Sequence, residues 1–109
     1  MARLFDEGKK MKSPAKPSTS YHDDLLRRLK DPEFAAGYLS KCLEDDEATF
    51  LVALRDVAQA HGGLRELSRK THLNREHLFR MLSKSGNPHL HSLRQLVGAV
   101  GLKLTLQPA

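Results

Sequence analysis

Residues 63–83, GLRELSRKTHLNREHLFRMLS, decide how the rest of the chain is interpreted. Apolar residues recur in this stretch at helical spacing before and after residues 71–73: Leu64, Leu67, Leu78, Met81 and Leu82. Ser68 is small enough for a second helix to cross closely over the first. Asn74 predicts the start of that second helix, because its side-chain oxygen can accept from amides two or three residues later. The stretch therefore predicts a helix-turn-helix, in which the start of the second helix enters the major groove of DNA.

The outward side of this second helix is polar, and its residues suit the reading of bases. The candidates for contacts with base edges are Arg75, Glu76, His77 and Arg80. Arginine pairs with guanine and glutamate accepts from cytosine, and each good pair contributes about 1–3 kcal/mol of discrimination. Phe79 has two interpretations, contact with a thymine methyl group or packing beside the turn. The candidates for contacts with the DNA backbone, for which plain solvation is the alternative, are Arg55, Arg65, Asn74, Lys84 and Asn87.

The net charge of +5 is distributed unevenly over the 109 residues. Residues 1–20 hold five Lys/Arg against two acids, residues 21–50 hold four against eight, and residues 51–109 hold nine against three. The most basic part therefore contains the helix-turn-helix, where attraction to phosphates assists binding. The acidic part suits either a basic protein partner or a solvated face.

Three parts are expected: a flexible basic arm at 1–20, an N-terminal helical extension at 21–46, and the helix-turn-helix DNA-binding domain at 47–109. The arm combines Gly, Pro, Ser and Lys without periodicity. It is either a segment that orders on DNA or a partner, or a plain disordered leader. The expected fold class is all-α, a helix-turn-helix bundle.

Four further helices are expected around the central stretch. A short one follows Tyr21, and a second begins at Asp31-Pro32, since Asp caps and Pro is tolerated at the first helical position. The apolar side of this second helix is expected to contain Phe34, Tyr38, Leu39, Cys42 and Leu43. The strongest amphipathic helix is expected at 47–61, with inward residues Phe50, Leu51, Leu54, Val57 and Ala58. The last is expected at 91–100.

The tail after Gly101 alternates apolar and polar residues and predicts a short strand. Its apolar side would contain Leu102, Leu104 and Leu106. Because a lone strand is not stable in water, we expect these leucines to pair with a second copy in a homodimer, or with the sheet edge of a partner.

Several other functions are not indicated by the sequence. The histidines lack a cysteine or carboxylate cluster at ligand spacing, so no metal is expected. No phosphate-binding Gly loop or nucleophile motif is present, so we expect neither an enzyme nor a cofactor. Cys42 lies on an apolar stripe and is interpreted as a small core residue. Without a membrane span or a signal-peptide core, a cytoplasmic protein is expected.

Four pieces of the chain together resemble a known family: LLRRLKDPEFAAGYLSKCLEDD, FLVALRDVAQAHGGLRELS, LNREHLFRMLSKSGNP and LRQLVGAVGLKLTL. This is the HigA-like addiction-module antidote family of prophage-type antitoxins with a lambda-repressor-like helix-turn-helix, and the similarity covers roughly residues 21–106. The resemblance implies a dimeric repressor of its own operon that binds double-stranded operator DNA and neutralises a toxin, usually a RelE-superfamily ribonuclease. One departure is His72, which stands where the turn usually has Gly and must accept a less favourable backbone or shift the turn slightly.

Two alternatives remain beside this function: a stand-alone prophage-type transcriptional regulator, and a protein-interaction module without DNA binding. A small basic reading frame directly upstream would favour the antitoxin over the stand-alone regulator. From charge alone, residues 23–47, or the flank before them, are expected to contact the toxin.

Overall fold

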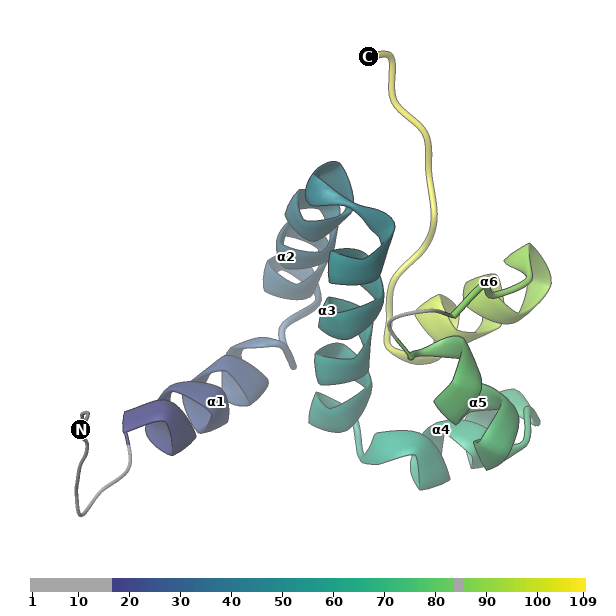
Figure 1. The fold of residues 1–109 in the computed structure, drawn as a ribbon, viewed down its shortest axis with the longest axis horizontal. Coiled ribbons are helices and arrows are strands. Elements are labelled where there is room, and N and C mark those ends of the chain that lie inside the picture. The colour runs from purple at the N-terminus through teal and green to yellow at the C-terminus, as the bar shows by residue number, and fades with distance from the viewer. Residues whose placement is uncertain (1–16, 84–85) are drawn as a thin grey trace.

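The computed structural model describes residues 17–83 and 86–109, and this part of the chain contains six α-helices (Figure 1). In chain order they are α1 (Pro17–Arg28), α2 (Pro32–Asp45), α3 (Glu47–Ala60), α4 (Gly63–Thr71), α5 (Arg75–Met81) and α6 (Leu90–Ala99). α3 is the centre of the arrangement, in contact with α1, α2 and α4, while α4 packs on α5 and α6. The expected all-helical class is confirmed. None of the helices in the described ranges combines the length and apolar character needed to cross a membrane.

The first helix begins earlier in the chain than the sequence predicts. α1 starts at Pro17 rather than near Tyr21, so residues 17–20, expected in the basic arm, are helical. Proline favours the first position of a helix, because its missing N–H is not needed there. The rest of the expected arm, residues 1–16, lies outside the described residues.

An aspartate caps the start of α2 and another caps the start of α3. The Oδ1 atom of Asp31 accepts from the backbone amide of Glu33 at 3.2 Å, with Pro32 as the first helical residue, and this confirms the predicted start of α2. Asp46 caps α3 in the same way, accepting from the Thr49 amide at 2.7 Å. Hydrogen bonds from Thr49, chiefly that of its backbone amide, lower the pKa of Asp46.

One hydrophobic core joins the helices of both halves of the chain. The five residues predicted to face inward from α3 are all buried: Phe50, Leu51, Leu54, Val57 and Ala58. The same cluster contains Leu29 and Leu39 from the first half, and Leu67 and Leu96 from the second. α3 ends at Ala60, just before the predicted stop at Gly62, whose φ of 102° is a left-handed conformation that glycine adopts at little cost. Because one cluster contains residues of both halves of the chain, each half depends on the other for its stability.

Leu43, predicted on the apolar side of α2, is not buried there. Its side chain is 52% exposed, whereas Ala35, which was not predicted, is fully buried. The buried stripe of α2 is centred on Ala35 and Leu39, with Cys42 partly buried at its far end. Leu43 lies four positions after Leu39 on the same side of α2, but it lines an open groove with Phe50 and Leu104 rather than a closed core.

The C-terminal tail is the main departure from the expected fold. The described residues contain no strand, and residues 102–109 follow α6 without regular secondary structure (Figure 1). The Leu102 amide donates to the Val97 carbonyl at 3.0 Å and its side chain packs on the core, but Leu104 is 41% and Leu106 is 99% exposed. A strand requires a neighbouring strand for its hydrogen bonds, and the described part of the chain supplies none. Pairing of these leucines in a dimer stays a prediction.

Candidate nucleic-acid interface

The turn between α4 and α5 contains the backbone conformation expected at the position where the resembled family has Gly. His72 has φ 65° and ψ 13°, and it is the only non-glycine residue with positive φ among the described residues. Hydrogen bonds on both sides hold the turn: the His72 amide donates to the Ser68 carbonyl at 2.9 Å, and the Ser68 hydroxyl donates to the Leu73 carbonyl at 2.5 Å. The left-handed conformation costs about 1–3 kcal/mol for a residue with a side chain. The surrounding bonds and packing must offset that cost.

Asn74 fixes the start of α5, as the sequence predicts. Its Oδ1 accepts from the backbone amide of His77 at 2.8 Å. Asn74 was also predicted to contact the DNA backbone, and its side-chain oxygen is engaged in this cap. Below it, Leu78 and Met81 are buried and attach α5 to the core. α5 is therefore held at its start by the Asn74 cap and along its length by the buried Leu78 and Met81.

Three of the four predicted base-reading residues lie on the exposed surface of α5. Arg75, Glu76 and Arg80 are exposed, as is Phe79. His77 differs, because it is half-buried and its Nε2 lies 3.4 Å from the Ser92 Oγ on α6. The outer surface of α5 is thus an arginine-rich face with one acid and one aromatic ring.

A hollow of 260 Å³ beside α5 brings together residues of this helix and of the loop before α6. It is lined by His77, Arg80, Met81, Asn87, Pro88 and His89. His77 and Arg80 were predicted to read bases and Asn87 to contact the DNA backbone, so the fold places these three around one surface. His89 was not predicted, and it reaches this surface only because the loop before α6 folds back on α5.

Gly86 permits this close approach of the loop. A Cβ atom at position 86 would lie 2.4 Å from the Met81 carbonyl oxygen and 2.9 Å from that of Arg80. The Gly86 amide donates to the Ser83 carbonyl at 2.9 Å, which holds the loop against the end of α5. The sequence indicates Gly86 only as a helix breaker. In the fold it positions Asn87 beside Arg80.

The predicted contacts to the DNA backbone occupy different surroundings. The Arg55 Nη2 donates to the Leu82 carbonyl at 3.0 Å, so this side chain ties α3 to the end of α5. Arg65 is exposed in the first turn of α4, and Asn87 is exposed in the loop. Lys84 lies outside the described residues.

Part of the positive charge of α4 is compensated within the helix. Arg69 donates to Glu66 through its Nε at 3.2 Å and through a second guanidinium nitrogen. This contact lowers the pKa of Glu66 and raises that of Arg69. Such exposed pairs contribute little to stability. Their consequence here is that Arg69 attracts an anion less strongly than an isolated arginine would.

The likeness of the chain to known proteins covers both the acidic and the basic half. A family model described as "probable addiction module antidote protein" matches residues 20–108. The chain belongs to this family. An uncharacterized protein of Haemophilus influenzae is 28% identical to it over 85 residues, which cover 77% of this chain and 87% of that protein. No solved structure matches the chain. The predicted resemblance is thereby confirmed for the antidote family, which implies a toxin as partner.

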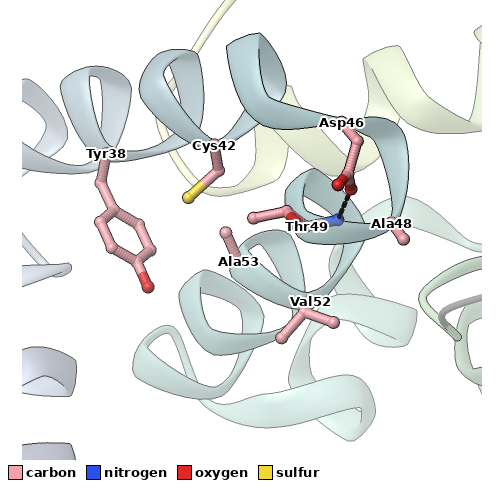
Figure 2. A pocket seen from close by; sticks show the side chains of 7 residues that line it. All are labelled: Tyr38, Cys42, Asp46, Ala48, Thr49, Val52 and Ala53. Atoms are coloured by element: carbon pink, nitrogen blue, oxygen red, sulfur yellow. Dashed lines mark hydrogen bonds between the residues drawn. The ribbon is translucent and has the colours of Figure 1, made fainter.

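Away from α5, this antidote protein has a groove of 340 Å³ between α2 and α3 (Figure 2). Its lining residues are Tyr38, Cys42, Asp46, Ala48, Thr49, Val52 and Ala53. Burial raises the pKa of the Cys42 thiol, and the negative charges of Asp45 and Asp56 raise it further. A reactive cysteine needs a lowered pKa. Cys42 packs against the core, and both observations agree with its interpretation as a packing residue.

The histidines of the antidote are spread over several elements. Among the described residues, no group of three or more His, Cys, Asp or Glu side chains is arranged to hold a metal ion. His61 ends α3, His72 forms the turn and His89 precedes α6. These three histidines have separate surroundings, whereas His77 and His89 share the hollow beside α5.

Proposed function

We propose that this antidote protein is the antitoxin of a type II toxin–antitoxin module. In this proposal it binds operator DNA through α4 and α5, represses its own operon, and neutralises a RelE-superfamily ribonuclease. It acts by binding in the cytoplasm, without catalysis or a cofactor. The proposal includes a HigA-like relationship, with α4 and α5 as a lambda-repressor-like helix-turn-helix.

The observation that carries the DNA-binding part is the outer face of α5. Arg75, Glu76 and Arg80 are exposed there, while the Asn74 cap and the buried Leu78 fix the helix beneath them. A helix already held in position loses less entropy on binding than a mobile segment would. Arginine suits guanine and glutamate suits cytosine in the major groove.

A homodimer fits this function. Two copies of α5 held about 34 Å apart would meet successive major grooves on one side of a palindromic operator. The exposed Leu104 and Leu106 in the tail support the proposal that the tail takes part in the dimer contact. Burial against a second copy would remove these apolar side chains from water.

For the toxin, charge supports a contact on the acidic half, within residues 23–47. Four consecutive exposed acids lie where α2 meets α3: Glu44, Asp45, Asp46 and Glu47. A nuclease that cleaves RNA needs a basic surface to bind its phosphates. An acidic surface on the antitoxin would attract that same basic surface.

The test of DNA binding compares an arginine on the proposed DNA-binding face of α5 with an arginine elsewhere in the fold. Fluorescence anisotropy would follow binding of the wild type, Arg80→Ala and Arg28→Ala to DNA upstream of the operon, at several salt concentrations with competitor DNA. Arg28 is the control, because it lies on α1 and pairs with Asp24 at 3.0 Å. We expect Arg80→Ala to weaken binding about 5-fold to 150-fold, the equivalent of one base contact, and Arg28→Ala to leave it nearly unchanged.

Each outcome separates the proposal from its alternatives. Saturable binding that survives competitor and falls only in Arg80→Ala supports a sequence-reading repressor. Binding that competitor abolishes, or that both variants weaken equally, contradicts it and leaves the protein-interaction module. A repressor with no toxin encoded next to it would be a stand-alone regulator.

A further inference from the structure

Phe79 is an exposed aromatic residue on the face of α5 that is proposed to meet DNA. Its side chain is 67% exposed, although Leu78 beside it is completely buried. The alternative from the sequence, packing beside the turn, would require a covered ring. The fold therefore leaves this ring available for a contact outside the chain.

The ring lies beside one apolar residue of α4 and two charged residues of α5. Leu64 of α4, Arg75, Glu76 and Phe79 line a hollow of 360 Å³ on one side of α5. The hollow on the other side is lined by polar residues, among them His77 and Arg80, together with Met81 and Pro88. An apolar surface formed by Leu64 and Phe79 thus adjoins two charged side chains that suit guanine and cytosine.

The base edges of the major groove present one apolar group, the C5-methyl of thymine, which apolar side chains recognise. Arg75 and Glu76 line the same hollow as Phe79. A base edge that contacts these two charged side chains would therefore place the adjacent base beside the ring. We infer that Phe79, supported by Leu64, reads the C5-methyl group of a thymine in the operator. The inference rests on the proposed DNA-binding function and adds a specificity-determining residue to it.

Deoxyuridine provides the direct test, because it lacks only this methyl group and keeps the hydrogen-bonding edge of thymine. The DNA upstream of the operon would be prepared in two forms, with thymine and with uracil throughout. The dissociation constants of the wild type, Phe79→Ala and Phe79→Leu would be measured for both forms. We expect the wild type to bind the uracil form about fourfold more weakly for each methyl that is read.

The variants separate the methyl contact from other effects of uracil on DNA. Phe79→Ala should bind the two forms equally, whereas Phe79→Leu should retain part of the preference because it keeps an apolar side chain. Uracil also changes the stiffness of DNA, but that effect would persist in Phe79→Ala. Circular dichroism would check that folding is intact, as expected for a ring that is 67% exposed.

Replacement of single thymines by uracil would then identify the base, with a loss expected at one position in each half-site. Equal binding of both forms by the wild type, or an unchanged preference in Phe79→Ala, would overturn the inference while leaving the repressor intact. If no wild-type binding survives competitor DNA, both the inference and the proposed function fail.

Discussion

The chain has an acidic half and a basic half that share one core. Residues 21–50 hold eight acids against four Lys/Arg, and residues 51–109 hold nine Lys/Arg against three acids. Both halves pack against α3, and one hydrophobic cluster runs through α1 to α6. Charge is therefore separated on the surface although the core is continuous. Surface changes should affect one partner at a time, whereas core changes should affect the whole domain.

The residues that cap the helices also differ in charge between the acidic and the basic half. α2 and α3 begin with the carboxylates of Asp31 and Asp46, but α5 begins with the neutral Asn74. All three side chains accept from a backbone amide within three residues. A neutral cap performs this local task without placing a negative charge where phosphates are proposed to bind.

The largest expected effect comes from the shared core. Leu54 of α3 is completely buried, so Leu54→Ala should lower the free energy of unfolding by about 2–5 kcal/mol. Because the cluster contains residues of both halves, they should unfold together in a single transition. Chemical denaturation followed by circular dichroism measures both quantities.

Leu43→Ala is the matched control, since it removes the same atoms from a side chain that is 52% exposed. Its effect should lie within about 0.5 kcal/mol. Two separate transitions in the wild type, or equal effects of the two substitutions, would contradict a core shared by the two halves.

The features predicted correctly from the sequence depend on residues close together in the chain. The inward stripe of α3 follows from helical periodicity, and the caps at Asp31 and Asn74 need only a suitable side chain before an amide. Periodicity and local hydrogen bonding were sufficient for these predictions. The left-handed backbone of His72 was expected only from the family resemblance, because that turn position usually has Gly.

The features that were missed depend on residues far apart in the chain. The Arg55 side chain donates a hydrogen bond to the Leu82 carbonyl, 27 positions away, and no pattern in the sequence indicates this acceptor. The half-burial of His77 depends on Ser92, 15 positions later. The strand expected after Gly101 failed for the same reason, because alternation indicates a strand only where a second strand accepts its hydrogen bonds.

The second prediction concerns toxin binding by the acidic half. Asp45→Lys should slow association with the protein encoded by the neighbouring reading frame by about fivefold to tenfold, because complementary charge accelerates association. Asp45 ends α2, where a positive charge also suits the helix dipole, so folding should be maintained. Surface plasmon resonance measures the association rate.

The control for this experiment adds the same charge elsewhere. Gln59→Lys combined with Gln107→Lys changes the net charge equally at exposed positions outside the acidic cluster. Asp46 is left in place, because its loss would remove the cap of α3. An equal slowing in the control would assign the effect to net charge and contradict a local toxin contact.

The third prediction tests the neutral cap of α5. Asn74→Ala should lower the free energy of unfolding by about 0.5–2 kcal/mol, because the His77 amide loses its acceptor. Asn74→Asp should keep the cap and most of the stability. It should nevertheless weaken DNA binding by about fivefold, since a carboxylate near phosphates repels them. Unchanged DNA binding by Asn74→Asp would mean that the start of α5 lies away from the phosphates.

The smallest expected effect lies where the acidic half meets α3. Burial raises the pKa of the Asp56 carboxyl, while the nearby His22 and Arg55 act in the opposite direction. An acid whose pKa is raised by folding stabilises the protein below its unfolded pKa, and this contribution is lost as pH rises through the folded value. At neutral pH the carboxylate of Asp56 therefore costs stability.

Asp56→Asn removes that cost and should raise the Tm at pH 7. Because Asp56 is only partly buried, solvent screening keeps the gain small, roughly 2 °C. At pH 3 the carboxyl of the wild type is protonated, so the difference in Tm between the two proteins should disappear. Thermal unfolding at both pH values measures this difference, and Asp23→Asn, an exposed acid on α1, provides the control. A Tm at pH 7 that falls in Asp56→Asn would mean that attraction to His22 and Arg55 outweighs desolvation, and that charge pairing rather than apolar packing holds the acidic half on α3.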